Sequence, residues 1–458
     1  MASSGTPVAS SAARTRSERR PEIEGLRGLA AVLVVVYHVW VGRVSGGVDV
    51  FFVLTGFLAV GQLLRASERG HVDLVAQWGR TLRRLVPPAV VVLAGTVVAS
   101  LLFLPESRWS QTLVEVVTSA TFTENWKLAA DSVDYYAAHD SASVVQHFWS
   151  LSIQGQFALV FPVLVVGAVL LARHRGAGVR STVAAVLVAV TALSFALSLW
   201  LTAADQQLAY FHSLTRVWEF TLGALLALVI DRIDLPVHLR VVLGWVGVVG
   251  LVSCGVALDV EGGFPGYLAG WPVLCAVAVL VAGSTGHALS ADRHLTARPL
   301  QYLGSISFPL YLWHWPVIMI LEALFHGNQN SENTWILGIV AVPISLILSE
   351  ISYQFIENPF RRGGYKKTWK NYWAARPSFS ELKDGFGKAM WPVVPFLVVA
   401  SLIGVVYGVV NSSDKTELEQ QLDQLQQLGV VDHVDLVQEH HDRRDADLTG
   451  QQDVLAGL

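Results

Sequence analysis

The feature that most constrains the fold is the repetition of apolar runs about twenty residues long. Eleven runs are predicted as membrane helices, at residues 23–42, 48–65, 85–104, 150–172, 181–201, 214–230, 239–258, 267–283, 304–325, 334–355 and 390–410. Each is long enough to cross the hydrocarbon core of a bilayer as a helix, which satisfies its own backbone hydrogen bonds there. Because 53% of the residues are hydrophobic and only 15% are charged, the sequence predicts an all-α, polytopic membrane helix bundle surrounded by lipid.

The loops between the runs alternate in charge. Loops after the even-numbered runs are mostly basic, most strongly before the eleventh run, whereas the opposite set is neutral to acidic. Basic loops are retained in the cytoplasm. The alternation therefore predicts a multi-pass protein with a cytoplasmic N-terminus and an extracytoplasmic C-terminus.

The runs also divide the chain into five parts. We expect a disordered cytoplasmic N-terminus (1–20), a membrane domain of ten runs (21–362), a basic cytoplasmic loop (363–389), the eleventh membrane helix (390–410) and a polar extracytoplasmic tail (411–458). The long outer loop between Pro105 and Gln146 contains an amphipathic stretch and several aromatic residues, so we expect it to form a folded cap.

Three ionisable residues in the first two runs are candidate site residues, because charges inside a membrane are costly to bury. Arg27 and His38 lie eleven residues apart, which is about three helical turns and roughly 16 Å on nearly one helix face. This spacing indicates a lined passage. Asp49 follows a short turn, from which its carboxylate is placed to orient His38 and raise its basicity. A snorkelling arginine, a core histidine and a span-end aspartate explain the same residues structurally.

Later runs carry further polar groups. Arg80 and Arg84 precede Pro87, where they suit either lipid headgroups or the phosphates of a nucleotide-bearing cofactor. Arg216 and Glu219 are three residues apart, a spacing that favours a structural ion pair. The other polar or aromatic candidates, which support packing or a site equally well, are His147, Trp149, Ser152, Gln154 and His314.

Several classes of site have no sequence signal. The chain has no G-x-S-x-G elbow, P-loop, G-x-G-x-x-G motif or cysteine–histidine metal framework, so we predict no metal site. Cys254 and Cys275 both fall within apolar runs and are interpreted as small apolar residues. The net charge of −4 is segregated by loop, and no nucleic-acid partner is expected.

Several motifs, in order, resemble the acyltransferase-3 family of integral-membrane acyltransferases. They include EGLRGLAAVLVVVYH, GGVDVFFVLTGFL, RVWEFTLGALLA, SISFPLYLWHWPV and YQFIENPF, and the resemblance covers roughly residues 22–362. It implies an enzyme of bacterial plasma membranes that moves an acyl group, commonly acetyl, from cytosolic acyl-coenzyme A to an extracytoplasmic hydroxyl. The implied acceptor is a cell-envelope glycan or glycolipid, so the modification would be polysaccharide O-acetylation.

The resemblance also implies roles for individual residues. His38 corresponds to the family's general base or transient acyl carrier, and Arg27 to the residue that orients the cofactor. Arg80 and Arg84 match a basic motif that holds coenzyme A at the cytoplasmic mouth. We keep Asp49 as the third candidate catalytic residue.

The chain departs from the family pattern in three places. The usual S-V-E-E-Q-F reads Ser152-Ile-Gln-Gly-Gln-Phe157, without either acidic residue, and Thr81 replaces a common arginine. Many relatives continue into an SGNH-hydrolase-like domain, for which this tail is too short. We therefore expect a truncated chain, a separate SGNH-type extracytoplasmic partner, or a membrane domain that acts alone.

Two alternatives to an acyltransferase stay open from the sequence. Arg27, His38, Asp49 and Glu219 would line a conduit in a transporter or exporter of a glycan- or lipid-linked substrate. The lost acidic residues would instead suit a non-catalytic relative that helps assemble other proteins.

Overall fold

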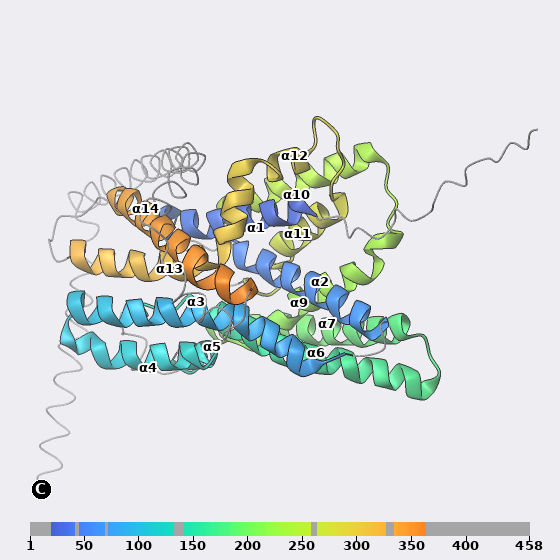
Figure 1. Cartoon of the computed structure of the whole chain (residues 1–458), viewed down its shortest axis with the longest axis horizontal. Helices are drawn as coiled ribbons and strands as arrows, with labels where there is room; N and C mark the ends of the chain where they lie inside the picture. The colour runs from blue at the N-terminus through green and yellow to red at the C-terminus, as the bar shows by residue number, and fades with distance from the viewer. Residues whose placement is uncertain are drawn as a thin grey trace, which may run out of the picture. The chain divides into compact units, whose positions relative to one another are not determined.

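The computed structural model describes residues 20–41, 45–68, 72–131, 142–257, 263–326 and 334–362, and every regular element within these ranges is a helix (Figure 1). Nine of the described helices are long and apolar enough to cross a membrane. The predicted all-α polytopic bundle is therefore confirmed. The loop at 363–389, the eleventh run at 390–410 and the tail at 411–458 lie outside the described residues, and the division into five parts stays a prediction.

The nine long helices of the described residues follow the first ten predicted runs in order, except the eighth. They are α1 (Pro21–Val36) with a π-helical turn at Tyr37–Val41, α2 (Gly47–Glu68), α3 (Leu74–Phe103), α6 (Phe148–Arg175), α7 (Val179–Ala204), α9 (Ser213–Val229), α10 (Val237–Ala257), α13 (Arg298–His326) and α14 (Thr334–Ser352) with a π-helical turn at Tyr353–Glu357. Shorter helices are α4 (Trp109–Ala120), α5 (Glu124–Asp131), α8 (Gln206–Phe211), α11 (Gly270–Ala282) and α12 (Ala291–Leu295). Helix α4 coincides with the amphipathic stretch of the predicted cap.

Two predicted boundaries were wrong. Helix α3 begins well before residue 85, because the carboxylate of Asp73 accepts a hydrogen bond from the backbone N–H of Ala76 (2.9 Å) and so caps an earlier first turn. Arg80 and Arg84 are consequently helical residues. The eighth run, predicted at 267–283, is only the 13-residue helix α11, because turns at 263–269 around Pro265 replace its first part.

Helices α2 and α9 pack closely through glycines. A Cβ atom on Gly56 would lie 1.8 Å from the carbonyl oxygen of Phe220, and one on Gly223 would lie 2.1 Å from that of Val53. Small residues let membrane helices approach to backbone contact. This crossing brings the start of α2, with Asp49, beside the start of α9, with Arg216.

Helices α1 and α13 approach in the same way. A Cβ atom on Gly304 would lie 2.0 Å from the carbonyl oxygen of Glu24. The contact sets the N-terminal half of α1 against the first turns of α13, so Arg27 reaches Ser307 and His38, in the π-helical turn after α1, reaches His314. Figure 1 shows α10, α11 and α12 lying together, while α6 and α7 form a long antiparallel pair.

Candidate active site

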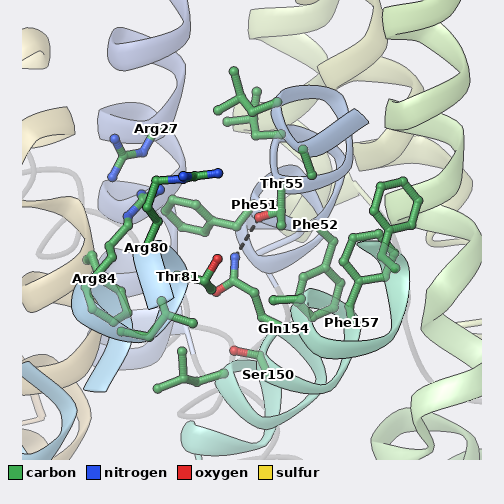
Figure 2. Close-up of a pocket in the computed structure, with 18 of the residues that line it drawn as sticks. Arg27, Phe51, Phe52, Thr55, Arg80, Thr81, Arg84, Ser150, Gln154 and Phe157 are labelled. Atoms are coloured by element: carbon green, nitrogen blue, oxygen red, sulfur yellow. Dashed lines mark hydrogen bonds between the residues drawn. The ribbon is translucent and has the colours of Figure 1, made fainter. Parts of the chain in front are cut away.

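A cavity of about 300 Å³ lies among α1, α2, α3, α6 and α13, and we call it the arginine cavity. Arg27, Arg80 and Arg84 all line it, so the structure brings together three basic residues that the sequence analysis singled out. Figure 2 shows the arginines on one side and the rings of Phe52 and Phe157 on the other. The cavity is therefore cationic on one wall and apolar on the opposite wall.

The three arginines differ in how they are held. Arg27 donates to the carboxylate of Glu24 (3.1 Å) and to the hydroxyl of Ser307 (2.8 Å). Arg80 is exposed and donates to the side-chain oxygen of Gln77 (2.6 Å). The Nε of Arg84 is buried and has no hydrogen-bond partner among the described residues. A guanidinium with an unused donor is suited to a phosphate or carboxylate group.

The polar residues at the start of α6 do not all face the arginine cavity. Gln154 lines the arginine cavity and donates to the hydroxyl of Thr55 (2.6 Å, Figure 2), whereas Ser152 is fully buried. Gly155 lies against Phe122, where a Cβ atom would be 2.5 Å from the ring. Of the two positions that are acidic in the family pattern, one therefore faces the cavity as a neutral amide and the other packs against the α4–α5 turn.

A second cavity of about 260 Å³ contains His38 and Asp49, and we call it the histidine cavity. Half of its other lining residues are aromatic: Trp149, Tyr210, Phe264 and Trp315 stand beside Ser45, Gly46, Val48 and Arg216. Val48 lines both cavities, so they approach each other at this side chain. The π-helical turn departs from regular α-helical spacing between Arg27 and His38, and the two residues line different cavities rather than one continuous surface.

His38 forms a close pair with His314. Nδ1 of His38 lies 2.9 Å from Nε2 of His314, and the two rings stack with centroids 5.2 Å apart and planes 10° from parallel. Trp315 packs edge-on against His38 at 5.1 Å. His314 is completely buried, whereas His38 is half-buried because it faces the cavity.

His147 lies next to this pair, with its ring centroid 5.5 Å from that of His314. Its Nε2 is 3.0 Å from the carbonyl oxygen of Leu312. Pro316 has no N–H, so this carbonyl lacks its usual helical donor four residues later. The imidazole of His147 therefore supplies the hydrogen bond that the backbone N–H of residue 316 would otherwise donate to this carbonyl.

Asp49 is bound to Arg216 rather than to His38. Nη1 of Arg216 donates to Asp49 (3.1 Å) and to Glu219 (3.0 Å), and all three side chains are at most 2% exposed. The predicted Arg216–Glu219 pair is thus confirmed. Asp49 and His38 line the same cavity, as their expected approach requires, but the described hydrogen bonds join Asp49 to Arg216 and His38 to His314. The α2–α9 crossing supplies Asp49 with a buried cation that requires counter-charges.

Aromatic rings enclose Arg216 within the histidine cavity. Its guanidinium carbon lies 5.4 Å from the ring of Trp149 and 5.0 Å from those of Tyr210 and Phe264. Such contacts stabilise a cation that has left water. Burial raises the pKa of Tyr210, on α8, to about 12, so its hydroxyl remains neutral at physiological pH.

Sequence reasoning missed several lining residues. Ser307 and Tyr311 line the arginine cavity, and with His314 they follow helical spacings of four and three residues, a signal that would have placed them on one face. Thr55 also lines this cavity, but no spacing in the sequence relates it to another candidate residue. Phe264 reaches the histidine cavity from a turn between α10 and α11, which no local pattern indicates.

The fold and these cavities define a multi-pass membrane protein with buried cationic and imidazole groups inside its helix bundle. A family model described as an acyltransferase domain, acyltransferase-3, matches residues 20–353. The chain therefore belongs to this family of membrane acyltransferases. Its orientation across the membrane and the roles of individual site residues stay predictions.

Curated relatives carry O-acetyltransferase names. The chain is 28% identical over 363 residues to O-acetyltransferase OatA of Staphylococcus aureus, which covers 76% of this chain and 58% of that protein. It is 26% identical over 405 residues to peptidoglycan O-acetyltransferase OatA of Listeria monocytogenes, covering 86% and 63%. The matches thus span about three fifths of each relative's length. No solved structure matches the chain.

Proposed function

We propose that this protein is a membrane O-acetyltransferase that moves an acetyl group from cytosolic acetyl-coenzyme A to a hydroxyl of an extracytoplasmic cell-envelope glycan. The observation that carries the proposal is the approach, at Val48, of an arginine-lined cavity and a histidine-lined cavity. One cavity suits an anionic donor and the other suits proton transfer to or from a hydroxyl. The Listeria relative's name, a peptidoglycan O-acetyltransferase, supports a cell-wall glycan as the acceptor.

The arginine cavity suits the donor. Coenzyme A carries several phosphate groups, and guanidinium groups bind phosphates with charge-assisted hydrogen bonds. Arg80 is exposed at the cavity and Arg84 has an unused buried donor, so both are available for the nucleotide end. Arg27 is already anchored by Glu24 and Ser307, which favours a role in holding the donor's orientation. The thin pantetheine arm would then run past Phe51 towards Val48, with its thioester at the histidine cavity.

His38 would act as the general base. Its imidazole takes the proton of the acceptor hydroxyl, and the oxygen attacks the thioester carbonyl carbon. Collapse of the tetrahedral intermediate breaks the carbon–sulfur bond, and the proton held by His38 passes to the leaving thiolate. The products are the acetyl ester and free coenzyme A.

The histidine cavity suits a sugar acceptor. Ligand sites combine apolar and aromatic walls with a few placed polar groups, and this cavity combines Trp149, Phe264 and Trp315 with His38 and Asp49. The aromatic faces provide apolar surface for a sugar ring, and His38 is placed for its hydroxyl. Asp49 then acts indirectly, by holding Arg216 in place.

The proposal is tested with purified protein in liposomes, supplied with acetyl-coenzyme A and muropeptide fragments. Wild type should release free thiol and add the mass of one acetyl group to the glycan, and H38Q should abolish both. R84L should raise the KM for acetyl-coenzyme A by about tenfold or more, the magnitude of one charge-assisted hydrogen bond. R180L, at an exposed arginine of α7, is the matched control and should leave both parameters unchanged.

Two outcomes would reject the proposal. Movement of unmodified glycan across the liposome without thioester cleavage would favour an exporter. Full acetylation by H38Q would show that His38 is not the general base of the reaction.

A further inference from the structure

The geometry of His314 determines which of its nitrogens carries the proton. Its Nδ1 lies 3.2 Å from the carbonyl oxygen of Leu310, and its Nε2 lies 2.9 Å from Nδ1 of His38. A carbonyl oxygen only accepts hydrogen bonds. The neutral imidazole of His314 therefore carries its proton on Nδ1 and presents a lone pair from Nε2. The opposite tautomer would set a lone pair against the carbonyl oxygen.

This assignment determines the tautomer of His38. Because Nε2 of His314 is an acceptor, Nδ1 of His38 must be the donor in the bond between them. The lone pair of neutral His38 is then on Nε2. We propose that His314 is the positioning residue that holds His38 in this tautomer and leaves Nε2 as its reactive nitrogen, an inference that rests on the proposed acetyl transfer.

Neighbouring residues leave this assignment undisturbed. His147 also contacts His314, and its Nε2 is already engaged with the carbonyl oxygen of Leu312. Asp49 is engaged with Arg216. Stacking at 10° and the edge of Trp315 hold the ring of His38 against that of His314.

A histidine suits this position physically. A carboxylate often fixes the tautomer of a catalytic histidine, but a buried carboxylate needs its own counter-charge. A neutral imidazole accepts the same hydrogen bond without adding a charge to the bundle. When Nε2 of His38 takes the hydroxyl proton, the resulting imidazolium donates more strongly from Nδ1 to His314, which stabilises it until the proton leaves with the thiolate.

The test compares H314Q with H314L in the liposome assay. The side-chain oxygen of glutamine accepts the bond from His38, whereas leucine is of similar size and accepts nothing. We expect H314L to lower kcat by about 100-fold or more, within the range of acid–base catalysis, with the KM for acetyl-coenzyme A unchanged. H314Q should stay within about tenfold of wild type. H174L, at an exposed histidine near the end of α6, is the control for a histidine-to-leucine change.

A second measurement does not depend on activity. Nitrogen-15 NMR of histidine-labelled protein in lipid, with His38 assigned by the signal lost in H38Q, reports which nitrogen carries the proton. Wild type and H314Q should show His38 protonated at Nδ1, and H314L should lose that preference. A wild-type His38 protonated at Nε2, or equal losses of kcat in H314Q and H314L, would overturn the inference. If wild type shows the Nδ1 tautomer but transfers no acetyl group, the proposed function fails while the tautomer assignment stands.

Discussion

Removing the positive charge of Arg216 should be among the most damaging single changes to this bundle. The side chain is 2% exposed and its Nη1 donates to two buried carboxylates, Asp49 and Glu219. R216L would leave both carboxylates without a cation and would also remove the contacts with the surrounding aromatic rings. Removing one partner of a buried ion pair costs about 3–5 kcal/mol of unfolding free energy. We expect R216L to reach at least that range.

Two matched variants distinguish the effect of an unpaired buried charge on stability from the effect of any substitution. D49N removes one carboxylate but keeps the bond between Arg216 and Glu219, so its cost should be smaller, about 1–3 kcal/mol. R180L breaks the exposed pair between Arg180 and Glu68, whose side chains are 49% and 59% exposed, and should cost less than about 1 kcal/mol. The expected order of destabilisation is R216L, then D49N, then R180L.

The measurement is unfolding in mixed micelles, with the fraction of sodium dodecyl sulfate increased stepwise and tryptophan fluorescence recorded. Each variant's shift in midpoint, multiplied by the common slope, gives its change in unfolding free energy. Equal midpoints for R216L and R180L would refute the reasoning, because they would show that the two buried carboxylates do not depend on Arg216. A D49N variant less stable than R216L would refute the charge argument specifically.

Two further predictions concern other parts of the molecule. V48F should lower kcat for acetyl transfer at least tenfold, because the larger side chain fills the space where the two cavities approach. The control V90F, on the exposed face of α3, should keep the wild-type kcat. Equal kcat values for V48F and V90F would show that the thioester does not pass Val48. Burial raises the pKa of Glu124, on α5, to about 8, above the unfolded value of about 4.3, so the folded state keeps a proton that the unfolded state loses. Stability should therefore fall as the pH rises from about 5 to 8, and E124Q should flatten this dependence of the melting temperature; parallel curves would contradict it.

The sequence predicted local features well. Hydropathy placed ten apolar runs that correspond to observed helices, because a membrane span is set by length and composition alone. Arg27, Arg80 and Arg84 stood out as basic residues at span ends, and they share a cavity. The Arg216–Glu219 pair followed from helical spacing. Each of these features depends on residues close together in the chain.

The partners of the central groups depended on helix crossings that no local pattern specifies. His38 pairs with His314, 276 residues away, and Asp49 pairs with Arg216, 167 residues away. The sequence alone suggested that Asp49 and His38 would pair, because only a short turn separates them. Backbone contacts at Gly56 and Gly304 instead set each helix against a distant one.

The sequence by itself therefore determined the membrane helices, their order and the polar residues within them. Only the tertiary structure decided that Val48 lies at both cavities, that Arg216 holds Asp49 and that His314 meets His38. The physical reason is that burial of a polar group in a membrane demands a partner, while the helix that supplies the partner is selected by close packing between segments far apart in the chain.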